Sequence, residues 1–191
     1  QFYGSDDHDH MKQTFRYTLL STCFIMSIFI AIALLFPENI IRFFVNDDKV
    51  IAEGSRYIVV SALSFIPTMF TMAIAGSMRA TGDSKTPLFA SIVSMFTNLI
   101  FNYALIYGHF GFPALGVVGA GIGTLIARIV ELLIIYFSLK TGEYVFRSSS
   151  KDLFNISPTL IKAITLIALP LSINEILYAS GMALLLRFYG T

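Results

Sequence analysis

The sequence has 191 residues, of which 55% are hydrophobic and only 13% are charged, and its mean hydropathy is +0.74. A soluble domain averages about 25% charged residues, so this composition argues against a soluble globular protein. The formal net charge of +1 excludes the strong basic field that nucleic-acid binding requires. A single cysteine, Cys23, excludes an internal disulfide framework and gives no pattern of zinc ligands.

Five apolar stretches are long enough to cross a bilayer, because a helix of about 20 residues spans about 30 Å of hydrocarbon. These stretches are too long and too continuous for the alternating strands of a membrane barrel, and only helices or closed barrels satisfy their backbone in lipid. The sequence therefore predicts an all-α membrane protein, a bundle of about five transmembrane helices. The predicted spans cover residues 18–36, 57–78, 87–107, 116–139 and 163–187.

Prolines lie inside two of these spans, and the segments between the spans differ in character. Pro67 stands at the centre of the second span and Pro170 inside the fifth, and each would let its helix bend. The segment "NIIRFF" between the first two spans predicts a helix that lies in the membrane interface. The longest link, residues 141–162, separates the first four spans from the fifth. Because the sequence begins QFYG and ends directly after an apolar run, we expect it to be a piece of a longer protein.

The basic residues of the connections predict the orientation in the membrane. Cytoplasmic loops carry an excess of lysine and arginine, and the two sides of this chain differ strongly. One side holds Arg42, Lys49 and Arg56. The other side holds Lys12, Arg16, Arg79, Lys85, Lys140, Arg147, Lys151 and Lys162. We therefore expect the start of the chain in the cytoplasm and the end of the fifth span outside.

Two asparagines stand in an otherwise apolar stretch, "TNLIFNYALIYG". Asn98 and Asn102 lie one helical turn apart, so both amides face the same neighbour. One interpretation is a structural link between helices through hydrogen bonds. The other is a cation or proton-relay site, because hard cations bind carbonyl oxygens. The spacing leaves both interpretations open.

The fourth span offers a surface that the asparagines can meet. Gly119 and Gly123 form a GxxxG pair, which lets a neighbouring helix approach closely. Thr124, beside this small face, brings a hydroxyl oxygen that also has the option of bonding its own backbone. Arg128 and Glu131 follow at the i and i+3 positions and predict a local ion pair within the membrane.

Glu175 is an acid near the middle of the fifth span, with no basic residue within a turn of it. An acid at a helix centre costs about 2.5 to 3.5 kcal/mol on insertion scales. Pro170, five residues earlier, frees a backbone carbonyl. We interpret Glu175 as a group that binds and releases a proton.

The remaining polar motifs give no enzyme signature. The cluster "DDHDH" at residues 6–10 resembles a metal site, but no further His or Cys follows at ligand spacing. We therefore interpret it as a solvated loop with acids at a helix start. His109 receives no role. The chain has no nucleophile elbow, P-loop or HExxH motif, and we expect neither enzymatic activity nor an organic cofactor.

Two stretches, "MRATGDSKTPLF" and, eight residues later, "NLIFNYALIYGHFGFPALGVVGAGIGT", resemble the multidrug and toxic compound extrusion (MATE) family of antiporters. "ALPLSINEILYASG" is similar to the start of that family's second lobe, and the resemblance covers essentially the whole chain. It implies twelve helices in two lobes of six, of which this chain holds the third to seventh. Residues 1–140 would then belong to the first lobe, 141–162 to a cytoplasmic linker and 163–191 to the first helix of the second lobe.

The resemblance also implies roles for individual residues. In some members an Asn and an acid one turn apart, a Thr on the next helix and an acid on the first helix form a cation site. Asn98 and Thr124 match the Asn and the Thr, whereas Asn102 replaces the acid. An amide can bind Na⁺ but cannot carry a proton, so the match permits Na⁺ at these three residues. Glu175 resembles an acid of the seventh helix that other members use in coupling.

From these patterns we expect an efflux antiporter of the inner membrane that exports organic cations or other amphiphilic drugs by alternating access. Na⁺ or H⁺ would be the coupling ion, and the partners would be the bilayer, small amphiphilic substrates and the rest of the same transporter chain. A flippase for lipid-linked precursors is one alternative, although its cavity should be more basic. A membrane-embedded subunit without transport activity is another.

Overall fold

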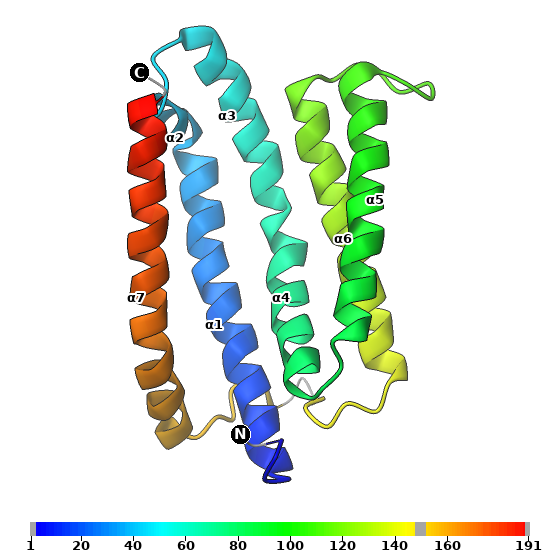
Figure 1. The fold of residues 1–191 in the computed structure, drawn as a ribbon, viewed down its shortest axis with the longest axis vertical. Coiled ribbons are helices and arrows are strands. Elements are labelled where there is room, and N and C mark those ends of the chain that lie inside the picture. Colours follow the sequence, from blue (N-terminus) through cyan, green and yellow to red (C-terminus); the bar gives the residue numbers. More distant parts are fainter. Residues whose placement is uncertain (1–2, 148–151, 190–191) are drawn as a thin grey trace.

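The computed structural model describes residues 3–147 and 152–189, and these residues contain seven helices and no strand. Figure 1 shows the helices side by side and roughly parallel to one long axis. Their bounds are α1 His8–Leu35, α2 Pro37–Arg42, α3 Asp48–Leu63, α4 Phe65–Ala80, α5 Lys85–Tyr107, α6 Val117–Thr141 and α7 Pro158–Tyr189.

Four of the described helices, α1, α5, α6 and α7, are long and apolar enough to cross a membrane. α3 and α4 pass the same test as a pair that is bent by 41°. With this pair counted as one span, the described residues provide five spans. The predicted all-α membrane fold with about five transmembrane helices is therefore confirmed.

The second predicted span bends near Pro67, where the sequence predicted a bend, but the bend is a 41° break between two helices. Instead of one helix with Pro67 at its centre, the structure has two helices that meet at Ser64. Pro67 is buried in the first turn of α4. A proline has no N–H to donate to the carbonyl four residues earlier, and its ring clashes with that carbonyl. For Pro67 this carbonyl belongs to Leu63, the last residue of α3, so the proline accounts for the break.

α1 and α7 begin earlier than the hydropathy of the sequence indicated. α1 begins at His8, ten residues before the predicted span, and α7 begins at Pro158. Asp7 caps α1, because its carboxylate accepts a hydrogen bond of 3.1 Å from the backbone N–H of His10. This bond lowers the pKa of Asp7. One acid of the "DDHDH" cluster therefore stabilises a helix start.

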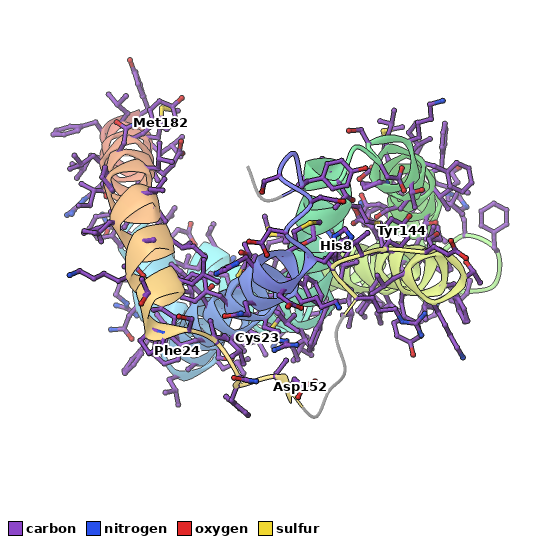
Figure 2. The ribbon with its side chains drawn as sticks, turned by 90° about the horizontal axis from the view of Figure 1, so that it is seen from below. His8, Cys23, Phe24, Tyr144, Asp152 and Met182 are labelled. Atoms are coloured by element: carbon purple, nitrogen blue, oxygen red, sulfur yellow. The ribbon has the colours of Figure 1, made fainter. Side chains whose placement is uncertain are left out.

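Different helices form the two edges of the bundle. In Figure 1, α7 lies beside α1 at one edge, and α5 and α6 form the other. Figure 2, viewed from the end where the chain starts, places Met182 of α7 and Tyr144 on opposite sides. The start of α1, the α4–α5 turn, the end of α6 and the start of α7 share one end of the bundle. The basic residues predicted to share a side therefore share an end, except that Lys151 lies outside the described residues.

The predicted linker, residues 141–162, packs against the first helices where the structure describes it. Phe146 is only 1% exposed, and its ring centroid lies 5.2 Å from that of Phe15 on α1. The buried Arg16 donates a hydrogen bond of 2.9 Å to the backbone carbonyl of Asn155. Residues on both sides of 148–151 are thus attached to α1.

A hydrogen bond also joins this segment to the α4–α5 turn, because the Tyr144 hydroxyl donates to the Asp83 carboxylate at 2.6 Å. The bond holds the pKa of Asp83 below its ordinary value, and burial, followed by the same bond, raises the pKa of Tyr144. Asp83 therefore stabilises the fold above its unfolded pKa and loses this effect as the pH falls through its lower folded pKa. Tyr144 contributes fully below its unfolded pKa and loses its contribution as the pH rises through its higher folded pKa.

We expect Tyr144→Phe to destabilise the complete protein by about 1 kcal/mol near neutral pH, because it removes this one bond. The difference from wild type should shrink in acid, where Asp83 is protonated in both proteins. Melting temperatures of the detergent-purified protein across the acid range measure this. Tyr136→Phe, at a tyrosine for which no hydrogen bond among the described residues is found, is the matched control. An acid-independent difference for Tyr144→Phe would contradict the assignment.

Candidate functional site

Close packing of α5 against α6 builds the candidate site. A Cβ added at Gly119 would lie 2.6 Å from the backbone carbonyl oxygen of Leu105, and one added at Gly123 would overlap the side-chain oxygen of Asn102. The predicted GxxxG pair therefore sits at a close approach of the two helices, and the missing side chain of Gly123 leaves room for the Asn102 amide.

Asn98, Asn102 and Thr124 form one hydrogen-bonded chain between these helices. Asn102 Nδ2 donates to Asn98 Oδ1 at 3.0 Å, and Asn98 Nδ2 donates to Thr124 Oγ1 at 3.2 Å. Thr124 Oγ1 in turn donates to the backbone carbonyl of Ala120 at 2.9 Å. The structure thus brings together three residues that the sequence analysis singled out, and it joins two helices through them.

One oxygen in this chain lacks a partner. Asn102 Oδ1 is buried and accepts no hydrogen bond. A buried acceptor without a partner costs about 1 to 3 kcal/mol, because it has lost its water and gained nothing. Interhelical hydrogen bonding explains the amide nitrogens of this cluster but leaves this oxygen, which lies against Gly123, without a hydrogen bond.

Arg128 and Glu131 form the ion pair that their spacing predicts. Arg128 Nη1 lies 2.6 Å from Glu131 Oε2, and the side chains are 45% and 7% exposed. The other carboxylate oxygen of Glu131 accepts a hydrogen bond of 2.9 Å from Ser91 on α5. Both oxygens of the buried acid are therefore satisfied.

Ser91 was not predicted as a site residue, and neither was a second serine, Ser94, whose hydroxyl donates to the backbone carbonyl of Ala127 at 3.0 Å. Their spacing was a usable signal, because residues 91, 94, 98 and 102 recur at intervals of three or four and so share one helical face. Together they make a polar row on α5 that faces α6.

An open cavity of about 460 Å³ lies along this polar row. Its size falls within the range of small-molecule sites, which is about 300 to 1,000 Å³. The residues that line it are Ser91, Ser94, Met95, Asn98, Thr124, Ala127 and Arg128.

Glu175 is not part of this cluster. It is exposed on α7, at the opposite edge of the bundle from α5 and α6 (Figure 1), and it makes no hydrogen bond or ion pair with another described residue. α7 continues as one helix through Pro170. Among the described residues no group of three or more His, Cys, Asp or Glu side chains is placed to hold a metal ion.

The sequence profile of the MatE family matches residues 1–104, more than half of the chain. The chain belongs to the MatE family. With its five apolar spans, it is a multi-pass membrane protein. No solved structure matches it.

Curated relatives of this MatE chain carry related names. It is 29% identical to the "Probable multidrug resistance protein YoeA" of Bacillus subtilis, over 98% of this chain and 41% of the relative. It is 29% identical to the "Probable multidrug resistance protein NorM" of Thermotoga maritima, over 76% of this chain and 31% of the relative. It is 27% identical to the "Probable multidrug resistance protein NorM" of Halalkalibacterium halodurans, over 90% of this chain and 38% of the relative. The chain thus spans less than half the length of these relatives.

The family match of this MatE chain ends inside α5. Asn98 and Asn102 lie within the matched residues, whereas Thr124, Arg128 and Glu175 lie beyond them. The similarity to YoeA extends over nearly all of the chain, so the polar face of α6 belongs to a part that is still shared with a relative.

Proposed function

We propose that the complete protein is an efflux antiporter of the inner membrane. It exports organic cations or other amphiphilic compounds and takes up Na⁺ or H⁺ in exchange. Family membership and the names of the relatives, all multidrug resistance proteins, support this function. The single structural observation that carries it is the buried, unpaired oxygen of Asn102.

The Asn98, Asn102 and Thr124 oxygens suit Na⁺ better than a proton. All three are neutral oxygens, the ligand type that hard cations prefer, and none of them titrates near neutral pH. Asn98 Oδ1 and Thr124 Oγ1 lie within the same hydrogen-bonded chain as the free Asn102 oxygen. A bound cation would use the free oxygen first, because this binding breaks no existing bond.

Glu175 is the proposed proton-coupling group. It is an acid in an apolar helix, which is a costly feature that membrane proteins keep for function. Its distance from the asparagine cluster means that the two groups act as separate coupling elements, one on each edge of this part of the transporter.

Alternating access is the proposed transport mechanism, in which ion binding shifts the population between inward-open and outward-open states. Residues 1–140 belong to one lobe and α7 to the next. The bend between α3 and α4 and the proline in α7 are the points at which helices of each lobe adjust. The grouping of basic residues at the end where the chain starts supports a cytoplasmic start.

The charge of the cavity disfavours the flippase alternative. A carrier of lipid-linked phosphates needs an excess of positive charge, whereas Glu131 already pairs with Arg128, the one basic side chain that lines this cavity. A subunit without transport activity would have no use for a cavity lined by Asn98, Thr124 and Arg128.

Dye efflux from vesicles that contain the complete protein tests this function, with Na⁺ and pH gradients imposed separately. Asn102→Leu should reduce Na⁺-driven efflux at least about tenfold, since even outer-shell changes at metal sites have effects of this size. Glu175→Gln should instead abolish the pH-driven component. Asn39→Leu removes an exposed amide from α2 and serves as control. If neither gradient drives efflux by the wild-type protein, the proposed antiporter function is wrong.

A further inference from the structure

The cavity between α5 and α6 has two chemically different ends. Asn98 and Thr124 stand at one end and contribute oxygen atoms. Arg128, one turn further along α6, stands at the other end and contributes N–H donors. Four residues of helix rise separate the two ends by about 6 Å.

Arg128 has donors to spare, whereas the hydroxyls of the cavity do not. Ser91 donates to Glu131, Ser94 to Ala127 and Thr124 to Ala120, so each hydroxyl hydrogen is already used. An arginine side chain has five N–H donors. Arg128 is shown with a single hydrogen bond among the described residues, from Nη1 to Glu131.

Glu131 holds the guanidinium in place. The acid is 7% exposed, while Arg128 remains 45% exposed on the side of the cavity. Ser91 fixes the second oxygen of the acid from α5, so the position of Arg128 is tied to both helices. A guanidinium held in this way binds an oxyanion with little loss of side-chain entropy. Because Glu131 neutralises part of its charge, we expect moderate rather than tight binding.

We propose that Arg128 is a recognition site for the carboxylate of a zwitterionic amphiphile. The cationic part of the same molecule points toward the Asn98 and Thr124 oxygens. Planar bidentate recognition of carboxylates is the task for which arginine is suited best. This inference rests on the proposed function, since it names the substrate class, and it assigns to Arg128 a role in addition to its structural ion pair.

Binding of two matched dyes to the complete, purified protein tests the proposal. Tetramethylrhodamine carries a cationic ring system and a free carboxylate, and its methyl ester replaces the carboxylate with an uncharged group that is one methyl larger. Fluorescence anisotropy gives the dissociation constant of each dye and needs no transport. We expect the wild-type protein to bind the free acid about tenfold more tightly than the ester, the effect of one charge-assisted hydrogen bond.

Two variants test whether Arg128 causes the preference for the free acid over the ester. Arg128→Gln combined with Glu131→Gln removes both charges and leaves no unpaired buried acid, and its ratio of dissociation constants should fall to about one. Arg128→Lys keeps the ion pair but loses the second edge of the guanidinium, so its ratio should fall to an intermediate value.

Equal binding of both dyes by the wild-type protein, a preference that survives in the double variant, or an undiminished preference in Arg128→Lys would overturn the proposal. If the wild-type protein bound neither dye, the proposal would be overturned as well. Efflux of the ester driven by an ion gradient remains a separate measurement, so a failure of the antiporter function is distinguishable from a failure of carboxylate recognition.

Discussion

Replacing Arg128 with glutamine alone should destabilise the complete transporter by about 3 kcal/mol, the lower part of the range for breaking a buried ion pair. The reason lies in the partner rather than in Arg128 itself. Glu131 is 7% exposed, so its carboxylate would be left in an apolar helix interface with only the hydroxyl of Ser91. The lower part of the range applies because Arg128 itself is 45% exposed.

The Arg128→Gln/Glu131→Gln double variant should recover most of this loss, because no buried charge remains without a partner. Melting temperatures of the wild type, both single variants and the double variant complete a double-mutant cycle, and residues in contact typically give a coupling energy of about 0.5 to 3 kcal/mol. Additive effects would show that the two side chains do not form a pair in the complete transporter.

The parts of the fold that hydropathy and short spacings encode could be predicted from the sequence. Continuous apolar runs located all five spans, and the i, i+3 spacing of Arg128 and Glu131 placed the two charges in contact. The small face of α6 and the two amides of α5 indicated a meeting of those helices, which the Asn98–Thr124 hydrogen bond provides. These features depend on one helix or on two consecutive ones.

Contacts between distant segments could not be predicted in the same way. Tyr144 and Asp83 are 61 residues apart and form a hydrogen bond, and Phe146 lies in a polar link yet is 1% exposed. Nothing in their immediate neighbours indicates burial, because it arises from the ends of several helices that meet at one end of the bundle. Pro67 predicted a bend in the second span but not the end of a helix at Leu63, because a proline acts on the carbonyl four residues before it.

The asparagine cluster shows where spacing stops being informative. Pattern alone left a structural link and a cation site open, and the structure shows the link, whereas the cation site remains our proposal. The amide nitrogens link the helices, whereas the Asn102 oxygen has no hydrogen-bond partner. On Asn102 the nitrogen forms a hydrogen bond, whereas the oxygen lies against Gly123, which has no side chain there. The spacing of the asparagines could not predict this difference between the two atoms.

Gly119→Ala should destabilise the complete transporter by about 1 to 3 kcal/mol, the usual effect of overpacking. The new Cβ would lie 2.6 Å from the Leu105 carbonyl oxygen, which is backbone and cannot turn away. α5 and α6 must therefore separate, and the Asn98–Thr124 hydrogen bond between them must lengthen. Both the melting temperature and Na⁺-driven efflux should fall.

Two further variants serve for comparison: Gly76→Ala adds a Cβ in open space, and Gly123→Ala adds one beside Asn102. Gly76 lies in α4 with no atom within 4 Å of an added Cβ, so its substitution should raise stability by up to about 1 kcal/mol through helix propensity. Gly123→Ala would overlap the Asn102 side-chain oxygen, which must rotate away, and would lie 3.1 Å from the Asn102 backbone nitrogen, which must shift slightly. It should therefore impair both Na⁺-driven efflux and stability, and stability less than Gly119→Ala does. A Gly119→Ala variant as stable as Gly76→Ala would contradict the close approach of α5 and α6, and with it the geometry that leaves the Asn102 oxygen free for a cation.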